Sequence, residues 1–114
     1  MGLLMETTTK HYYRNIEQIK KRNEAIGHNW FSADTMRFFS SEVLPTIYGG
    51  KYFISSEEDT YGNYERKFTI RIAYHDGQID TVGSFQAYDT AEEAIEAVTE
   101  LVERYRKQAS RWAK

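Results

Sequence analysis

RKFTIRIAYHDGQIDTVGSF, residues 66–85, is the stretch that decides the fold. Apolar and polar residues alternate through both of its halves, and Asp76-Gly77 between them is the dipeptide that a two-residue type I′ turn prefers. Such a turn places Tyr74 opposite Ile79 and brings the apolar residues of both halves to one face. We therefore predict an antiparallel hairpin with strands over Arg66–His75 and Gln78–Phe85.

The other face of this hairpin is mostly polar. Four of its side chains are candidates for partner binding: Lys67, Arg71, Asp80 and Gln86. The register places Arg71 diagonal to Asp80, so we also expect a surface ion pair between them, worth about 0–1 kcal/mol. A face of this kind is either a solvated surface or a flat polar surface that recognises a protein or a nucleic acid.

A second hairpin precedes the first in the chain. Gly49-Gly50 separates Val43–Tyr48 from Lys51–Glu57, which predicts two strands joined by a short turn. Pro45 has no N–H to donate to a ladder, so the strand that carries it is predicted to lie at a sheet edge or to contain a bulge.

Two helices frame the four strands. Apolar residues at spacings of three and four predict a helix from about Thr9 to Ile26, capped by one of the threonines at 7–9 and ended by Gly27. Thr90 and Glu93 form a capping-box pattern that opens a longer helix, which runs to about Arg111. The predicted fold is a single α+β domain over residues 1–114, with 1–6 and 112–114 frayed. Its four-stranded antiparallel sheet carries both helices on the apolar face.

A dense aromatic segment, NWFSADTMRFF at residues 29–39, lies between the first helix and the first hairpin. Ser32 is the predicted N-cap of a short helical turn. Large apolar side chains crowd the segment, and such a cluster belongs to a core or to a partner interface. Trp30 and Arg37 are the candidate partner-binding residues here.

Composition excludes several classes of function. The chain has 114 residues, no cysteine and a formal net charge of −2, so it has neither disulfides nor thiolate metal sites and no general pull toward nucleic acid. Apolar runs are too short for a signal peptide or a membrane span, and we expect a cytoplasmic protein without membrane contact.

Motifs for catalysis and cofactor binding are absent from the sequence. The three histidines occur singly, and no nucleophile elbow, P-loop or dinucleotide fingerprint is present, so we expect no cofactor, no metal and no enzymatic activity. His28, close to Asp34 and Glu42 in the sequence, is the one candidate general base, and a residue that hydrogen-bonds near a helix end is the alternative interpretation.

Four strings in the chain resemble a family of small uncharacterised proteins of bacteria and archaea that often occur on phages and plasmids. They are WFSADTMRFFSSEV, IYGGKYFISSE, RKFTIRIAY and DTVGSFQAYDTAEEA, within residues 23–97. The resemblance implies no agreed activity and no catalytic residues. Its association with mobile elements implies small accessory proteins such as inhibitors of host defence systems.

These observations lead to a non-catalytic protein-binding module as the first hypothesis, and the narrower form of this hypothesis is a phage-type inhibitor of a defence nuclease (an anti-CRISPR). The alternative is a nucleic-acid-binding module in which Lys20–Arg22 and Arg104–Lys114 straddle a phosphate backbone. A homodimer through Trp112 or the edge strand at Pro45 is compatible with both hypotheses.

Overall fold

The structure, a computed structural model, describes residues 13–38, 40–58 and 65–112, with side chains described to residue 108. Its helices and strands are α2 (Ile16–Ala25), α3 (Ala33–Phe38), β1 (Glu42–Val43), β2 (Tyr52–Glu58), β3 (Arg66–Ala73), β4 (Ile79–Val82) and α4 (Ala91–Trp112). The strands form one antiparallel sheet in the order β1-β2-β3-β4. The α+β prediction, a four-stranded antiparallel sheet with a shorter N-terminal and a longer C-terminal helix, is confirmed.

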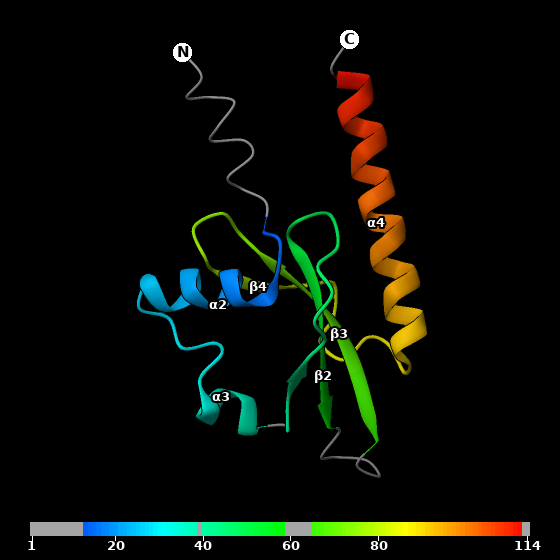
Figure 1. Ribbon diagram of the computed structural model, residues 1–114. Helices are drawn as coiled ribbons and strands as arrows, with labels where there is room; N and C mark the ends of the chain where they lie inside the picture. The colour runs from blue at the N-terminus through cyan, green and yellow to red at the C-terminus, as the bar shows by residue number, and fades with distance from the viewer. Residues whose placement is uncertain (1–12, 39, 59–64, 113–114) are drawn as a thin grey trace, which may run out of the picture.

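The helices lie on opposite faces of the sheet, so the prediction that both pack on one face is wrong. Figure 1 shows α4 along one side of the strands and α2 on the other. The central strand β2 explains this arrangement, because all residues from Tyr52 to Glu57 are buried and the strand therefore needs cover on both faces. Ile54 packs in the cluster under α4, whereas Phe53 packs with Ile19 of α2 and with Ala73.

The first described helix starts later than predicted. Asn15 is its N-cap, and the Asn15 side chain accepts a hydrogen bond from the Gln18 N–H at 3.0 Å. The chain at Tyr13 and Arg14 is not helical, so no continuous helix runs from Thr9 to Ile26, and the threonines proposed as caps lie outside the described residues. The predicted end is confirmed, since Gly27 has a left-handed φ of +84°.

The register of the second hairpin differs from the prediction by one residue. Ala73 rather than Tyr74 faces Ile79, because the turn contains three residues, 75–77, and not two. Tyr74 accepts from the Gly77 N–H and donates its own N–H to the Gln78 carbonyl, both at 2.9 Å. This is the geometry of a type I turn followed by a glycine bulge. The one-residue shift turns every side chain of β4 to the opposite face.

Helix α2 fixes this turn from outside the hairpin. The buried Asn23 side chain donates to the Gly77 carbonyl at 2.9 Å, and Arg22 Nε donates to the His75 carbonyl at 3.2 Å. Strand β4 is also short: it ends at Val82, ahead of Gly83 with its φ of +78°. The hairpin is thus set by tertiary contacts that its own sequence does not display.

The first hairpin is confirmed, but its turn contains three residues, 49–51, instead of the predicted two, and its first strand is shorter than predicted. Gly49 and Gly50 both have positive φ, and a bridge between Tyr48 and Tyr52 closes the turn. Strand β1 contains only Glu42 and Val43. Val43 pairs with Ser55 and Tyr48 pairs with Tyr52, so the chain between the two pairs is longer on the Pro45 side than on the β2 side. The extra residues lie around Pro45, so its strand is both an edge strand and bulged, as predicted.

Thr90 is the N-cap of the last helix, as predicted, and Glu93 is its partner. Thr90 Oγ1 accepts from the Glu93 N–H and donates to the Glu93 carboxylate, each at 3.1 Å. Helix α4 then runs over Ala91–Trp112, within one residue of the predicted bounds at each end. Figure 1 shows that its C-terminal part extends well beyond the sheet.

Gly77→Ala should destabilise the protein, and Gly83→Ala is its matched control. Both glycines have positive φ, so both changes strain the backbone, but a Cβ at Gly77 would lie 2.7 Å from the Arg22 carbonyl oxygen whereas one at Gly83 would meet nothing within 4 Å. We expect a loss of about 2–3 kcal/mol for Gly77→Ala and about 1 kcal/mol for Gly83→Ala in urea unfolding. Equal losses would contradict the contact between α2 and the turn.

Candidate functional site: an aromatic pocket

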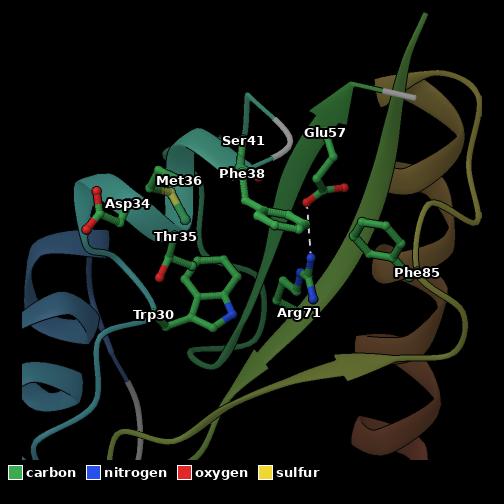
Figure 2. A pocket seen from close by; sticks show the side chains of 9 residues that line it. All are labelled: Trp30, Asp34, Thr35, Met36, Phe38, Ser41, Glu57, Arg71 and Phe85. Carbon is green, nitrogen blue, oxygen red and sulfur yellow. Dashed lines mark hydrogen bonds and ion pairs between the residues drawn. The ribbon is translucent and has the colours of Figure 1, made fainter. Parts of the chain in front are cut away.

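A pocket of about 450 Å³ opens on the α2 face of the sheet, between α3 and strands β2 and β3. Figure 2 shows its lining, which we call the aromatic pocket: Trp30, Asp34, Thr35, Met36, Phe38, Ser41, Glu57, Arg71 and Phe85. The volume is within the range of about 300–1,000 Å³ that is usual for ligand-binding sites.

A buried ion pair forms the base of the pocket. Glu57 on β2 is 1% exposed and accepts from Arg71 Nη2 at 3.1 Å, while Thr69 donates to its other oxygen at 2.7 Å. The Ser55 hydroxyl donates to Glu57 and accepts from Arg71 Nε, and Thr81 accepts from Arg71 Nη1. Every polar atom of the pair is therefore hydrogen-bonded, which is the condition under which a buried charge pair is tolerated.

Two aromatic rings flank the Arg71 guanidinium. Its central carbon lies 5.3 Å from the centre of the Trp30 ring and 5.4 Å from that of Phe85, at the distance of a cation–π contact. In Figure 2 the two rings stand on either side of Arg71. Trp30 is fixed in turn by edge-to-face contacts with Phe31 and Phe53, at 4.7 and 5.6 Å between ring centres. These contacts give the pocket rigid walls.

The rim of the pocket exposes large apolar side chains. Phe38 at the end of α3 is 75% exposed, and Phe85 in the segment after β4 is 44% exposed. Ser32 caps α3 as predicted, since its hydroxyl accepts from the Thr35 N–H at 3.2 Å. The cap and the short helix together present Met36 and Phe38 to the pocket.

The structure brings part of the predicted site together. Trp30 and Arg71 both line the aromatic pocket, and Gln86 lies next to it, with its side chain donating to the Glu57 carbonyl at 3.4 Å. Lys67 is on the same sheet face but pairs with Asp89 at 2.6 Å.

Two other predicted site residues lie elsewhere. Arg37 is exposed and pairs with Asp34 at 3.4 Å, outside the pocket lining. Asp80 is on the α4 face, where it accepts from the Tyr74 hydroxyl at 3.2 Å. The predicted ion pair between Arg71 and Asp80 is therefore wrong, because the register shift moves Asp80 to the other face and Glu57 takes its place.

Sequence reasoning missed Glu57, Phe38 and Phe85 as site residues. For Glu57 a signal was present: Thr69 and Arg71 alternate with apolar residues in β3, and Ser55 and Glu57 are two residues apart on the strand that pairs with it. Pairing β2 with β3 would have placed the carboxylate beside the guanidinium. It would also have indicated that this polar face is buried.

Within residues 13–38, 40–58 and 65–112, no three histidines, cysteines or carboxylates gather in a way that could hold a metal ion. The same residues include no helix long and apolar enough to cross a membrane. His28, the candidate general base, is exposed and does not line the aromatic pocket.

A family model matches residues 15–99, which include the whole aromatic pocket. The chain belongs to DUF7447, a family of unknown function. The match extends from the start of α2 into α4 and so covers the sheet and both of its faces. Neither the curated proteins nor the solved structures gave a match to this chain.

Proposed function

We propose that this member of DUF7447 is a non-catalytic binding module that docks on another protein through the aromatic pocket. The observation that carries the proposal is the rim: Phe38 and Phe85 expose large aromatic surface beside a rigid, charged base. Aromatic residues around a pocket are the usual anchors of protein interfaces, and exposed apolar patches of this kind mark interaction sites.

The chemistry of the base supports binding rather than catalysis. A general base needs a carboxylate oxygen that can accept a proton from a substrate. Glu57 is almost fully buried and its two oxygens already accept from Ser55, Thr69 and Arg71. The pair therefore serves as a fixed platform, and the exposed atoms around it are mostly apolar.

Nucleic-acid binding is the alternative, and the arrangement of the basic residues favours it less. Lys20 pairs with Glu17 at 3.5 Å, and Arg22 is engaged on the hairpin turn. Figure 1 places the end of α2 and the end of α4 on distant parts of the molecule, so the two basic clusters do not border one surface. If nucleic acid is bound, the affinity must fall steeply with salt concentration.

Affinity purification from the native host tests the docking proposal. The tagged protein is captured with and without nuclease treatment, and Phe38→Ser and Phe85→Ser are compared with Ile95→Ser, which changes an exposed apolar residue on α4. We expect a nuclease-resistant protein partner that the two pocket variants lose and the control retains. A partner retained by all three variants would move the interface away from the pocket.

The narrower hypothesis of a phage-type inhibitor of a defence nuclease stays a prediction. The same experiment addresses it, since the identity of a captured partner names the pathway in which the protein acts.

A further inference from the structure

We infer that the aromatic pocket receives an extended, uncharged segment of the partner protein, with an apolar side chain between the rim phenylalanines and a main-chain carbonyl on Arg71. This inference rests on the proposed function and specifies the chemistry of the occupant. Three properties of the pocket lead to it: the directions from which Arg71 can be approached, the compensation of its charge, and a second concave surface that adjoins it at α3.

Arg71 can be approached only at its edge. Trp30 and Phe85 flank the guanidinium on two sides, with its central carbon 5.3 and 5.4 Å from their ring centres, and this leaves little room beside it for a third ring. Arginine has five N–H donors, and Arg71 uses three of them, on Ser55, Thr81 and Glu57. The remaining two meet no acceptor among the described residues, and the side chain is 11% exposed. A hydrogen-bond acceptor that enters between the two rings completes this set.

The paired charges in the pocket favour an uncharged hydrogen-bond acceptor over a charged one. The Glu57 carboxylate lies 3.1 Å from Arg71, so a carboxylate or phosphate on the same guanidinium would meet repulsion at short range. At the rim, Asp34 pairs at 3.4 Å with Arg37, which lies outside the lining and offsets the Asp34 charge. A charged occupant would lose its hydration in this apolar surrounding without gaining an opposite charge. An amide carbonyl accepts hydrogen bonds and carries no net charge, so it suits both the free donors of Arg71 and the compensated charge around them.

A second concave surface adjoins the aromatic pocket, and its lining mixes apolar and polar residues. A second pocket of about 460 Å³ lies between α2, α3 and β1, and it shares Met36 and Ser41 with the first. Its charged residues are also compensated, Lys20 by Glu17 and Glu42 by Arg66. In both pockets the charged side chains are paired, and the two pockets meet at α3. An extended peptide segment could therefore pass from one pocket into the other. A compact small molecule would use only one of them.

Capped tripeptides test this assignment on the full chain. Acetyl-Ala-Phe-Ala-amide, acetyl-Ala-Glu-Ala-amide and acetyl-Ala-Lys-Ala-amide have no terminal charges and differ only in the central side chain. Each is titrated while NMR follows the Trp30 indole N–H and the Arg71 Nε–H. We expect the phenylalanine peptide to shift both signals at millimolar concentration, and the two charged peptides to bind roughly tenfold more weakly or worse.

Two variants separate binding in the pocket from a structural effect. Phe38→Ser removes an exposed side chain and should weaken the phenylalanine peptide at least about fivefold without changing the fold. Arg71→Lys keeps the charge but removes the planar fork that would donate to a peptide carbonyl, and should weaken the phenylalanine peptide at least about fivefold. If Arg71→Lys does not fold, the wild-type chemical-shift changes and the Phe38→Ser affinity still test whether the peptide binds in the aromatic pocket.

Equal affinity for the three peptides, or tighter binding of the glutamate peptide, would overturn the inference. So would shifts that leave the Trp30 and Arg71 signals unchanged. The proposed function can fail separately from this inference. If a partner is captured through Phe38 but the three tripeptides bind equally, only the assignment of the occupant is contradicted. If the phenylalanine tripeptide is preferred but Phe38→Ser still captures the partner, only the docking proposal is contradicted.

Discussion

Replacing Glu57 with alanine should lower the free energy of unfolding by about 3–5 kcal/mol, because the change leaves the buried Arg71 charge without its partner. The loss has two sources. The guanidinium keeps the cost of leaving water but loses the carboxylate, and the Thr69 and Ser55 hydroxyls lose their acceptor. Denaturant unfolding monitored by circular dichroism measures the change.

Asp34→Ala is the matched control for this variant. It also removes one carboxylate from an ion pair with arginine, but Asp34 and Arg37 are both largely exposed. Exposed pairs contribute about 0–1 kcal/mol, so the control should unfold almost like the wild type. If the two variants lost the same free energy, the Glu57–Arg71 pair would not be the buried base of the pocket.

Replacing both members of the buried pair should behave differently from replacing one. A Glu57→Met, Arg71→Met double variant removes both charges together with their desolvation cost, so we expect it to be clearly more stable than Glu57→Ala alone. It should also lose the edge donors of Arg71, and with them any binding that requires a carbonyl acceptor. The double variant would then be more stable than Glu57→Ala and yet unable to bind a carbonyl at this position.

Local rules predicted the features that depend on local sequence. The Thr90 N-cap, the terminator at Gly27 and the Ser32 cap each require only neighbouring residues, and all three are present. The strands were predicted from alternation for the same reason, with ends that were too long.

The features that failed depend on residues distant in sequence. The type I′ turn at Asp76-Gly77 was the local preference, but Asn23 and Arg22 bind the carbonyls of a three-residue turn instead. That single residue of register decides which face Asp80 occupies, so the error passed from the turn to the predicted site. Arg71 and Trp30 were separate candidates, one on the polar sheet face and one in the aromatic segment, and their juxtaposition follows from the packing of α2 and α3 on the sheet.

Phe53→Ala should be the most damaging core substitution on the pocket side of the sheet, at about 3–5 kcal/mol. Phe53 is fully buried on β2, packed against the adjacent rings of Trp30 and Phe31 and paired with Arg71 on the neighbouring strand. Its removal leaves a cavity under the Trp30 wall. Phe38→Ala makes the same chemical change at a 75% exposed position, and should cost within about 0.5 kcal/mol.

The readout for Phe53→Ala includes the pocket as well as the fold. In a Trp112→Phe background Trp30 is the sole tryptophan, so its emission reports the packing of the wall. We expect a red-shifted emission and lost tripeptide binding for Phe53→Ala at temperatures where circular dichroism shows the protein still folded. Phe38→Ala should keep the wild-type emission and yet bind the peptide poorly. If Phe53→Ala kept both emission and binding, Trp30 would owe its position to the Asn23 contact, 3.2 Å from the Trp30 N–H, and not to the aromatic core.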